Sequence, residues 1–553
     1  MPLKQQGTTD RLVDAIVVGA GFGGLYALYR LRDMGLSVLC VERGSDVGGT
    51  WFWNRYPGAR VDTYSLNYSY SFAEDLQQEW DWSERYAPQA ELYAYLRHVT
   101  DRFDLRRDIL LETEVTSAVW DEESAWWAAL TDTGATIRAR YLISAAGVLS
   151  ATNVPDFPGL QSFQGTYVHT SRWPDRLDVS GKRVGVIGTG SSGVQVVPPL
   201  ARETAHLYVF QRTANFCIPQ LNGQVPATVE QEWKASYGDR REEARYAGGG
   251  SYPALAPEFS GRNLSPAERT RLLESAWAEG SAPHMMTVFN DVLTNDESNG
   301  YVADFIRNKI RDTVKDPEVA ELLCPTDHYF ATKRPVMENG YYETFNRPNV
   351  TLVDVKADPI ETITPTGVRT ASGVERELDV IVLATGFDAI TGPLLRLGVV
   401  GRDGQKLEQK WADGPSTYLG MITSGFPNFF FLTGPGSPSV LGNVITSLEL
   451  HVDWIADVID HMRSEGFTEV EATPEGEEEW TAFVQAAADC TLYTKVESWY
   501  LGSNIPGKAR IFLPFVGGVG NYRRACEEAR VKGWPGLLMT KHEAEISSAA
   551  VTP

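Results

Sequence analysis

The sequence has 553 residues, of which 43% are apolar and 22% are charged, and its formal net charge at pH 7 is −22. This length and composition predict a globular chain of about two to four domains with a sizeable core. The excess of acidic residues excludes an extended basic surface, so we expect neither a nucleic-acid partner nor binding to an anionic membrane.

Cysteines and apolar runs narrow the class of protein further. The five cysteines are scattered along the chain without a C-x-x-C pair. This pattern predicts no metal site and no redox dithiol, and it indicates a reducing, cytoplasmic location. The N-terminus lacks the apolar segment of a signal peptide, and no apolar run reaches about 18 residues. We therefore expect no membrane span, and we expect a frayed tail after Lys541.

The first predicted unit consists of a strand, a glycine loop, a helix and a second strand. Residues 15–18 and 37–42 predict the strands, and leucines at helical spacing between them predict the helix. The loop fits G-x-G-x-x-G through Gly19, Gly21 and Gly24. Glycines at these positions allow a tight turn and a close approach of the backbone to a pyrophosphate at the helix N-terminus.

Glu42 strengthens the prediction of a dinucleotide site. It ends the second strand 18 residues after Gly24, where an acidic side chain can accept hydrogen bonds from ribose hydroxyls. The alternative is a glycine-rich turn without a ligand. The spacing by itself does not distinguish FAD from NAD.

A second unit repeats this plan, with strands predicted at residues 183–187 and 207–211. Its loop contains Gly188, Gly190, Ser191, Ser192 and Gly193. Arg212, followed by Thr213, lies 19 residues after Gly193, where NAD sites place an acid. A guanidinium there can pair with a 2′-phosphate, so this site is predicted to prefer NADP(H). The alternative for Arg212 is an ordinary surface arginine.

The predicted fold class is α/β, with two dinucleotide-binding Rossmann-like domains and a helical insertion. Residues 226–332 are charged and rich in Ala and Glu, which predicts the helices of the insertion, and Ser265 with Glu268 predicts a capping box. The first domain is expected to comprise residues 1–150 and 385–553, including a buried strand in the Phe-rich stretch 426–434. The second is expected to comprise residues 151–225 and 333–384.

Two dinucleotide sites in one chain indicate hydride transfer from a nicotinamide to a flavin. A disulfide reductase would need a reactive cysteine pair, and the sequence has none. Activation of oxygen by the reduced flavin remains.

Six ordered motifs resemble those of type I Baeyer–Villiger monooxygenases. The stretch FQGTYVHTSRWP fits that family's fingerprint through Phe163, Gly165, His169, Thr170 and Trp173. The other motifs are GGTWFWNRYPGARVD, with Gly49, Trp51 and Asp62, and then ATKRP, LATGFD, GPGSPSVLGN and SWYLGSNIPGK. The resemblance covers nearly the whole chain. It is strongest toward the phenylacetone and steroid monooxygenase branch and weaker toward the cyclohexanone branch.

The resemblance implies oxidation of a ketone to an ester or lactone by NADPH and O₂, with FAD in the first domain and NADP(H) in the second. It implies a C4a-peroxyflavin stabilised by the fixed cation of Arg334, with Asp62 orienting that cation. Without the resemblance, Lys333 and Arg334 before a proline would indicate a surface basic pair. The implied partners are a small ketone and O₂, and the expected assembly is a monomer or weak homo-oligomer.

The resemblance also implies binding roles for several other side chains. Lys333 would share the NADP 2′-phosphate with Arg212, and Trp499 would contact the NADP ribose. Val440 and Leu441 would limit the size of the substrate pocket. For Trp499 the alternative is an ordinary core tryptophan.

Two other functions stay open. A flavin-containing monooxygenase that oxygenates nitrogen or sulfur would use the protonated hydroperoxide and would not need Arg334. A non-catalytic flavin protein or redox sensor would hold the cofactors without rapid turnover.

His169 has three interpretations: a general base, a metal ligand, or a structural contact at a hinge. No metal-ligand partners lie at suitable spacing, and a base needs reach to a reacting proton. The fingerprint directly precedes the second predicted domain, and such junctions absorb dihedral changes between domains. We therefore favour the hinge interpretation.

Overall fold

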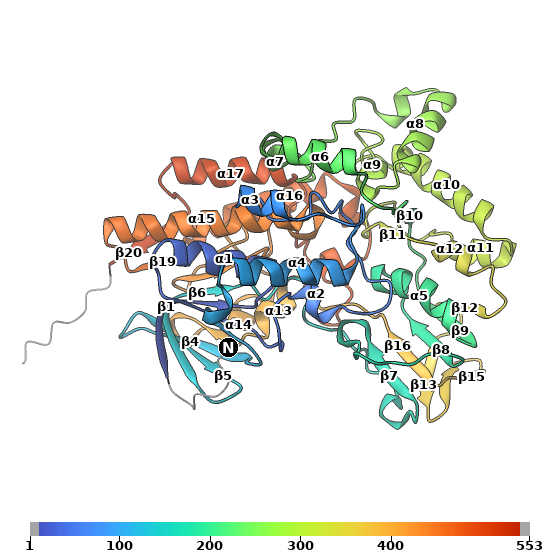
Figure 1. The fold of residues 1–553 in the computed structure, drawn as a ribbon, viewed down its shortest axis with the longest axis horizontal. Coiled ribbons are helices and arrows are strands. Elements are labelled where there is room, and N and C mark those ends of the chain that lie inside the picture. The colour runs from blue at the N-terminus through green and yellow to red at the C-terminus, as the bar shows by residue number, and fades with distance from the viewer. Residues whose placement is uncertain (1–9, 542–553) are drawn as a thin grey trace, which may run out of the picture.

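The computed structural model describes residues 10–541, and the tail expected to fray after Lys541 lies outside this range. The chain forms two large sheets whose central strands are parallel (Figure 1), one at the left of that view and one at the lower right. The expected α/β fold with two Rossmann-like sheets is confirmed. No helix within residues 10–541 is long and apolar enough to cross a membrane.

The first sheet has eight strands in the order β17-β4-β5-β6-β1-β2-β3, with β18 also paired to β6. The core strands β1, β2 and β6 are parallel, whereas β4, β5 and β6 form an antiparallel meander. The bounds are β1 Arg11–Val18, β2 Val38–Val41, β3 Ile109–Leu110, β4 Val115–Asp121, β5 Trp126–Thr131, β6 Thr136–Ser144, β17 Val399–Val400 and β18 Phe429–Phe431. The buried strand expected in the Phe-rich stretch is confirmed as β18.

Helices cover one face of this sheet. Helix α1 (Phe22–Asp33) follows the first glycine loop and packs against α15 (Val444–Glu465). Side chains alternate along β1: Val17 belongs to the core beneath these helices, and Ile16 to the core on the opposite face. Burial on both faces explains the continuous apolar run at residues 15–18.

The second sheet has five parallel strands in the order β12-β9-β8-β16-β7. Helix α5 (Ser191–Glu203) follows the second glycine loop, and a small antiparallel sheet of β13, β14 and β15 completes this part. The bounds are β7 Thr166–His169, β8 Arg183–Ile187, β9 His206–Gln211, β12 Val350–Asp354, β13 Ile360–Thr364, β14 Gly367–Thr370, β15 Glu375–Glu377 and β16 Val380–Leu383.

Residues 226–332 carry six α-helices, and the chain segments just before and just after these helices lie side by side. Strand β10 (Cys217–Pro219) precedes these helices and pairs in parallel with β11 (Val336–Glu338), which follows them. The helices are α6 Ala227–Ala235, α7 Tyr237–Tyr246, α8 Pro266–Ala278, α9 Ala282–Met286, α10 Asp296–Thr313 and α11 Pro317–Leu323. The capping box of Ser265 and Glu268 is confirmed at the start of α8.

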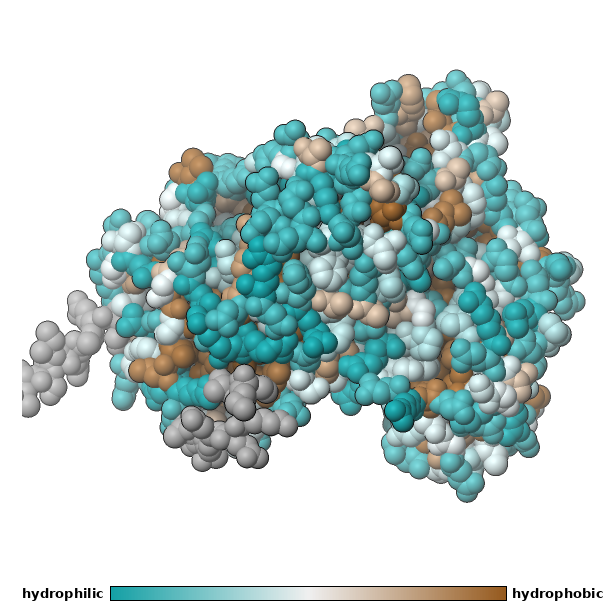
Figure 2. All heavy atoms as spheres, in the orientation of Figure 1, coloured by the Kyte–Doolittle hydropathy of each residue, from teal (hydrophilic) through white to brown (hydrophobic). Residues whose placement is uncertain are grey.

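The remaining α-helices of the described chain lie outside the two glycine-loop units and the insertion. They are α2 Thr50–Trp53, α3 Glu74–Glu79, α4 Gln89–Arg102, α12 Tyr341–Thr344, α13 Thr391–Leu395, α14 Leu407–Lys410, α16 Pro474–Asp489 and α17 Val519–Val531. Strand β20 (Leu537–Thr540), near the end of the described chain, pairs antiparallel with β19 (Glu469–Ala472). The face shown in Figure 2 is mostly hydrophilic, with apolar residues in small scattered patches.

Candidate functional site

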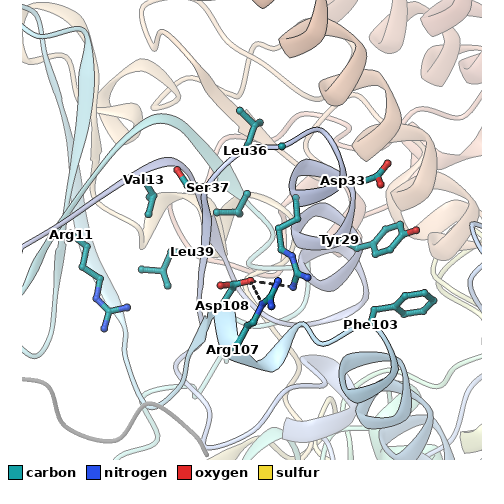
Figure 3. A pocket seen from close by; sticks show the side chains of 13 residues that line it. Arg11, Val13, Tyr29, Asp33, Leu36, Ser37, Leu39, Phe103, Arg107 and Asp108 are labelled. Carbon is teal, nitrogen blue, oxygen red and sulfur yellow. Dashed lines mark hydrogen bonds and ion pairs between the residues drawn. The ribbon is translucent and has the colours of Figure 1, made fainter.

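A cavity of about 1440 Å³ lies between the two sheets. Both glycine loops line it, together with Asp62, Arg334 and Trp499. A separate surface hollow of about 620 Å³ lies beside the start of β1 and the end of α1 (Figure 3). There Asp108 pairs with Arg32 and Arg107, so the charges in that hollow largely satisfy one another. The large cavity is therefore the candidate site.

The first glycine loop forms a cradle that excludes side chains. Gly19 has φ +104°, and a Cβ on Gly24 would lie 1.8 Å from the Gly19 carbonyl oxygen. Gly21 is the N-cap of α1 and lies close to Gly49, which has φ +51°. The N-terminus of α1 is thus open to a pyrophosphate, because neither Gly21 nor Gly49 places a side chain in front of it.

Glu42 is buried beside this cradle and lines the cavity. Its carboxylate accepts hydrogen bonds from the backbone N–H groups of Ala20 (2.8 Å) and Gly44 (2.6 Å). These bonds fix the carboxylate at the end of β2. A carboxylate has further lone pairs, so it can also accept from a ribose hydroxyl.

The second glycine loop repeats this construction. Gly188 has φ +108°, and a Cβ on Gly193 would lie 2.2 Å from the Gly188 carbonyl oxygen. Gly190 is the N-cap of α5 and makes no side-chain capping bond, and, apart from its chain neighbours, no atom of the described residues lies within 4 Å of the position that its Cβ would take. The first N–H groups of α5, from Ser191 onward, are therefore available to an anion.

A cationic wall stands beside this second loop. Arg212 directly follows β9 and is exposed, Lys333 is half-buried, and both line the cavity. Neither forms an ion pair within residues 10–541. Burial lowers the pKa of Lys333, and the positive charge of Arg212 contributes in the same direction. Thr213 supports the wall, since its carbonyl accepts from the Thr189 hydroxyl (2.8 Å). Two cations without a carboxylate partner can together bind a phosphate group that carries two negative charges.

The structure brings Arg334 and Asp62 together, although 272 residues separate them. Nε and Nη2 of Arg334 donate to Oδ2 of Asp62 at 2.9 and 2.7 Å. Nη1 donates to the carbonyl oxygen of Val440 at 2.5 Å. The negative charge of Asp62 raises the pKa of Arg334 above its usual value, so the guanidinium keeps its positive charge in the cavity wall.

Tyr500 lies next to this cation. Burial raises the pKa of Tyr500 to about 12, although the positive charge of Arg334 opposes the shift. The phenol is therefore protonated at neutral pH.

The helices between β10 and β11 position the loop that carries Arg334. Asn299 on α10 donates to the carbonyl of Phe330 and accepts from its N–H, both at 2.9 Å. The next residue, Ala331, is buried and has φ +66°, a conformation that non-glycine residues rarely adopt. These contacts determine the path of the chain just before Lys333 and Arg334.

The two residues expected to limit the substrate pocket both lie in a 3₁₀ turn, Ser439–Leu441. Val440 lines the cavity. It also belongs to an apolar cluster with Tyr493, Tyr500 and Phe512, and Leu441 packs against the same cluster. Their role as limits of the pocket stays a prediction. Trp499 and Trp51 both line the cavity.

The fingerprint lies at the edge of the second sheet. His169 ends β7 opposite Leu383 of β16, and its Nδ1 accepts from the Ser171 N–H at 3.1 Å. Burial lowers the pKa of His169 to about 4, so the ring is neutral at physiological pH. It does not line the cavity, although Ser171 and Arg172 do.

The other fingerprint residues are close-packed. Phe163, Thr170 and Trp173 are buried. A Cβ on Gly165 would lie 2.5 Å from the carbonyl oxygen of Asp379. These four residues therefore pack tightly against their surroundings and are not among the residues that line the cavity.

Three groups contribute to this site that were not predicted from the sequence. Val440 contributes its backbone carbonyl oxygen, and a pattern of side chains does not predict such a contact. Tyr500 follows Trp499 directly but was not singled out. Gln195 is a polar residue between buried valines of α5. This interruption of an apolar pattern could have been recognised in the sequence.

The sequence and the fold of this chain are similar to those of known proteins. Residues 16–237 match the model of the pyridine nucleotide-disulphide oxidoreductase family. The chain is 45% identical to a Baeyer–Villiger monooxygenase of Pseudooceanicola batsensis, over 96% of this chain and 97% of that protein. It is 43% identical to a phenazine N-monooxygenase of Lysobacter antibioticus, over 95% of this chain and 97% of that protein. A solved structure of oxidized steroid monooxygenase bound to NADP matches with a TM-score of 0.91 at 49% identity, covering 96% of this chain and all of that one.

The second glycine cradle can be tested with two alanine substitutions. Gly193→Ala should lower the stability of the cofactor-free protein by about 1–3 kcal/mol, because the new methyl group overlaps the Gly188 carbonyl. Gly190→Ala should change that stability by less than about 0.5 kcal/mol, yet weaken NADP⁺ binding, because its methyl group occupies the space in front of α5. Thermal unfolding and NADP⁺ titration measure the two effects. Equal losses of stability would contradict this account.

Proposed function

The chain belongs to the type I Baeyer–Villiger monooxygenases, and we propose that it oxidises a ketone to an ester or lactone at Arg334, in the cavity between its two sheets. The observation that carries this proposal is a guanidinium held by Asp62 and Val440 in a cavity that also contains two glycine cradles. The natural ketone is set by the shape of the pocket around Val440.

The two cradles fit FAD and NADP(H). The residues that would hold FAD are the loop of Gly19, Gly21 and Gly24 with Glu42, and those for NADP(H) are the loop from Gly188 to Gly193 with Arg212. FAD supplies the oxygen-activating chemistry when bound, and NADPH supplies the hydride. We propose residues 1–150 and 385–553 as the FAD-binding domain and 151–225 and 333–384 as the NADP-binding domain.

Arg334 would stabilise negative charge on oxygen as the ketone carbonyl is attacked. A preorganised donor in a site with little water is more effective than one that must reorient during the reaction. Arginine also keeps its charge without exchanging a proton, and the charge of Asp62 favours that state. Asp62 holds Nε and Nη2 through one oxygen, which fixes the plane of the guanidinium.

Arg212 and Lys333 would bind the 2′-phosphate, and Trp499 would contact the neighbouring ribose. In support, all three line the cavity, and the two cations have no carboxylate partner within 4 Å among the described residues. A bound phosphate would therefore not have to displace an existing ion pair.

Oxygenation of an aromatic nitrogen is a second candidate function. It is favoured by the 43% identity to a phenazine N-monooxygenase. A product analysis over a ketone, an N-heteroaromatic compound and a sulfide distinguishes the two: an ester as main product supports the first proposal, and an N-oxide supports the second.

Arg334→Ala should abolish ester formation while NADPH still reduces the flavin. Without the cation the activated oxygen should leave as hydrogen peroxide, so ester formation should fall at least about 100-fold. Stopped-flow absorbance measures flavin reduction, and gas chromatography and a peroxide assay measure the products. Arg334→Lys is the control for charge without the bidentate geometry. Retained ester formation in Arg334→Ala would exclude this role.

Arg212→Ala should raise the KM for NADPH at least about tenfold and leave the KM for NADH nearly unchanged, because a charge-assisted phosphate contact is lost only with NADPH. Steady-state assays with both coenzymes measure this difference. Arg202, at the end of the same α5 region and not in the cavity wall, provides the matched control Arg202→Ala. Equal changes for NADPH and NADH would contradict the assignment.

His169→Ala should slow flavin reduction more than His169→Asn. An asparagine side chain can accept from the N–H two residues ahead, as His169 Nδ1 does with Ser171, so it preserves the turn after β7. Single-turnover reduction by NADPH measures the difference. Because the pKa of His169 is lowered to about 4, the wild-type rate should show no His169 titration between about pH 6 and 8. A His169→Asn rate as low as that of His169→Ala would contradict the hinge interpretation.

A further inference from the structure

The segment that leads to Asp62 contacts helix α5 at three points. The Tyr56 hydroxyl donates to Oε1 of Gln195 at 2.8 Å, and Nε2 of Gln195 donates to the carbonyl oxygen of Arg60 at 3.1 Å. Between these contacts, Gly58 has φ +86°, and a Cβ there would lie 2.3 Å from the backbone oxygen of Gln195. One side chain therefore holds both ends of a short loop that packs directly on α5.

A second glutamine holds the next residue of the same segment. Nε2 of Gln220 donates to the carbonyl oxygen of Val61 at 2.9 Å, and Gln220 is almost fully buried. Gln220 directly follows β10, and β10 pairs with β11, which begins two residues after Arg334. The carbonyl groups of the two residues before Asp62 are thus each fixed by a glutamine amide.

These amide contacts fix the backbone from which Asp62 reaches Arg334. Neither glutamine hydrogen-bonds to Arg334 within residues 10–541, so we expect an effect on the cation to pass through Asp62. Gln195 stands between Val194 and Val196, which are fully buried, and it lines the cavity four residues after the start of α5. A polar side chain at such a position costs stability unless its hydrogen bonds are made.

Resting on the proposed function, we propose that Gln195 is a positioning residue for the Asp62–Arg334 pair. It ties the Tyr56–Asp62 loop to the helix whose N-terminus forms the second glycine cradle. The cation that serves oxygen transfer is thereby aligned by the element that receives the nicotinamide nucleotide. Without this contact, nucleotide binding and hydride transfer remain, while the alignment of Arg334 is lost.

The first test is the variant Gln195→Met, which preserves side-chain length and removes both hydrogen bonds. We expect NADP⁺ affinity and the rate of flavin reduction by NADPH to change less than about twofold, and ester formation to fall about tenfold as hydrogen peroxide replaces it. Gln78→Met is the matched control, because Gln78 also donates to a carbonyl, that of Lys234 at 2.7 Å, but lies outside the cavity wall. That control should leave all three quantities unchanged.

A double-mutant cycle with Asp62→Ala tests whether Gln195 acts through Asp62. If it does, Gln195→Met should cause no further loss of ester formation in the Asp62→Ala background. Independent, multiplicative losses would overturn the proposal, and so would a loss of NADP⁺ affinity or of thermal stability as large as the loss of ester formation. If the wild-type enzyme forms no ester from any ketone, the proposed function itself fails, and that outcome is distinguishable from the others.

Discussion

The ion pair between Asp62 and Arg334 is the interaction on which the site depends. A guanidinium in a cavity wall is costly to desolvate unless a charge and hydrogen-bond acceptors compensate it. Asp62 supplies the charge, and the Val440 carbonyl supplies a third contact. These groups come from three distant parts of the chain: the loop after α2, the loop between α11 and β11, and the turn before α15. The fold brings Asp62, Arg334 and the Val440 carbonyl into contact.

The two glycine cradles show how one backbone construction serves two ligands. In both, a glycine with positive φ opens the turn, and a later glycine allows the helix to pack against the carbonyl of the first. The walls differ, since Glu42 stands beside one loop while Arg212 and Lys333 stand beside the other. A chain with a net charge of −22 still forms a cationic wall, because a phosphate responds to charges within a few ångströms and distant charges are screened.

Local patterns predicted the secondary structure around these loops well, and the limits of the prediction have physical reasons. Strand β1 begins at Arg11 and not at residue 15, because its polar start pairs with β6, and pairing depends on a strand more than 100 residues away. The contacts of Val440 and Leu441 were beyond a local pattern for a similar reason. Val440 belongs to a cluster with Tyr493, Tyr500 and Phe512, and Leu441 packs against it, so these contacts depend on a later segment of the chain.

The sequence by itself determined the two glycine loops, the arginine that follows the second, and the fingerprint that places the chain in its family. The two loops and the arginine could be recognised because each depends on backbone conformations within about 20 residues, whereas the fingerprint was recognised by its resemblance to a known family. The family resemblance led us to expect that Asp62 orients Arg334, and the tertiary structure shows their contact. Only the tertiary structure decided that Val440 completes this contact and that Gln195 holds the loop before Asp62. Such contacts depend on how two sheets and an insertion pack together, and this packing is the sum of many weak contacts that no short pattern of residues contains.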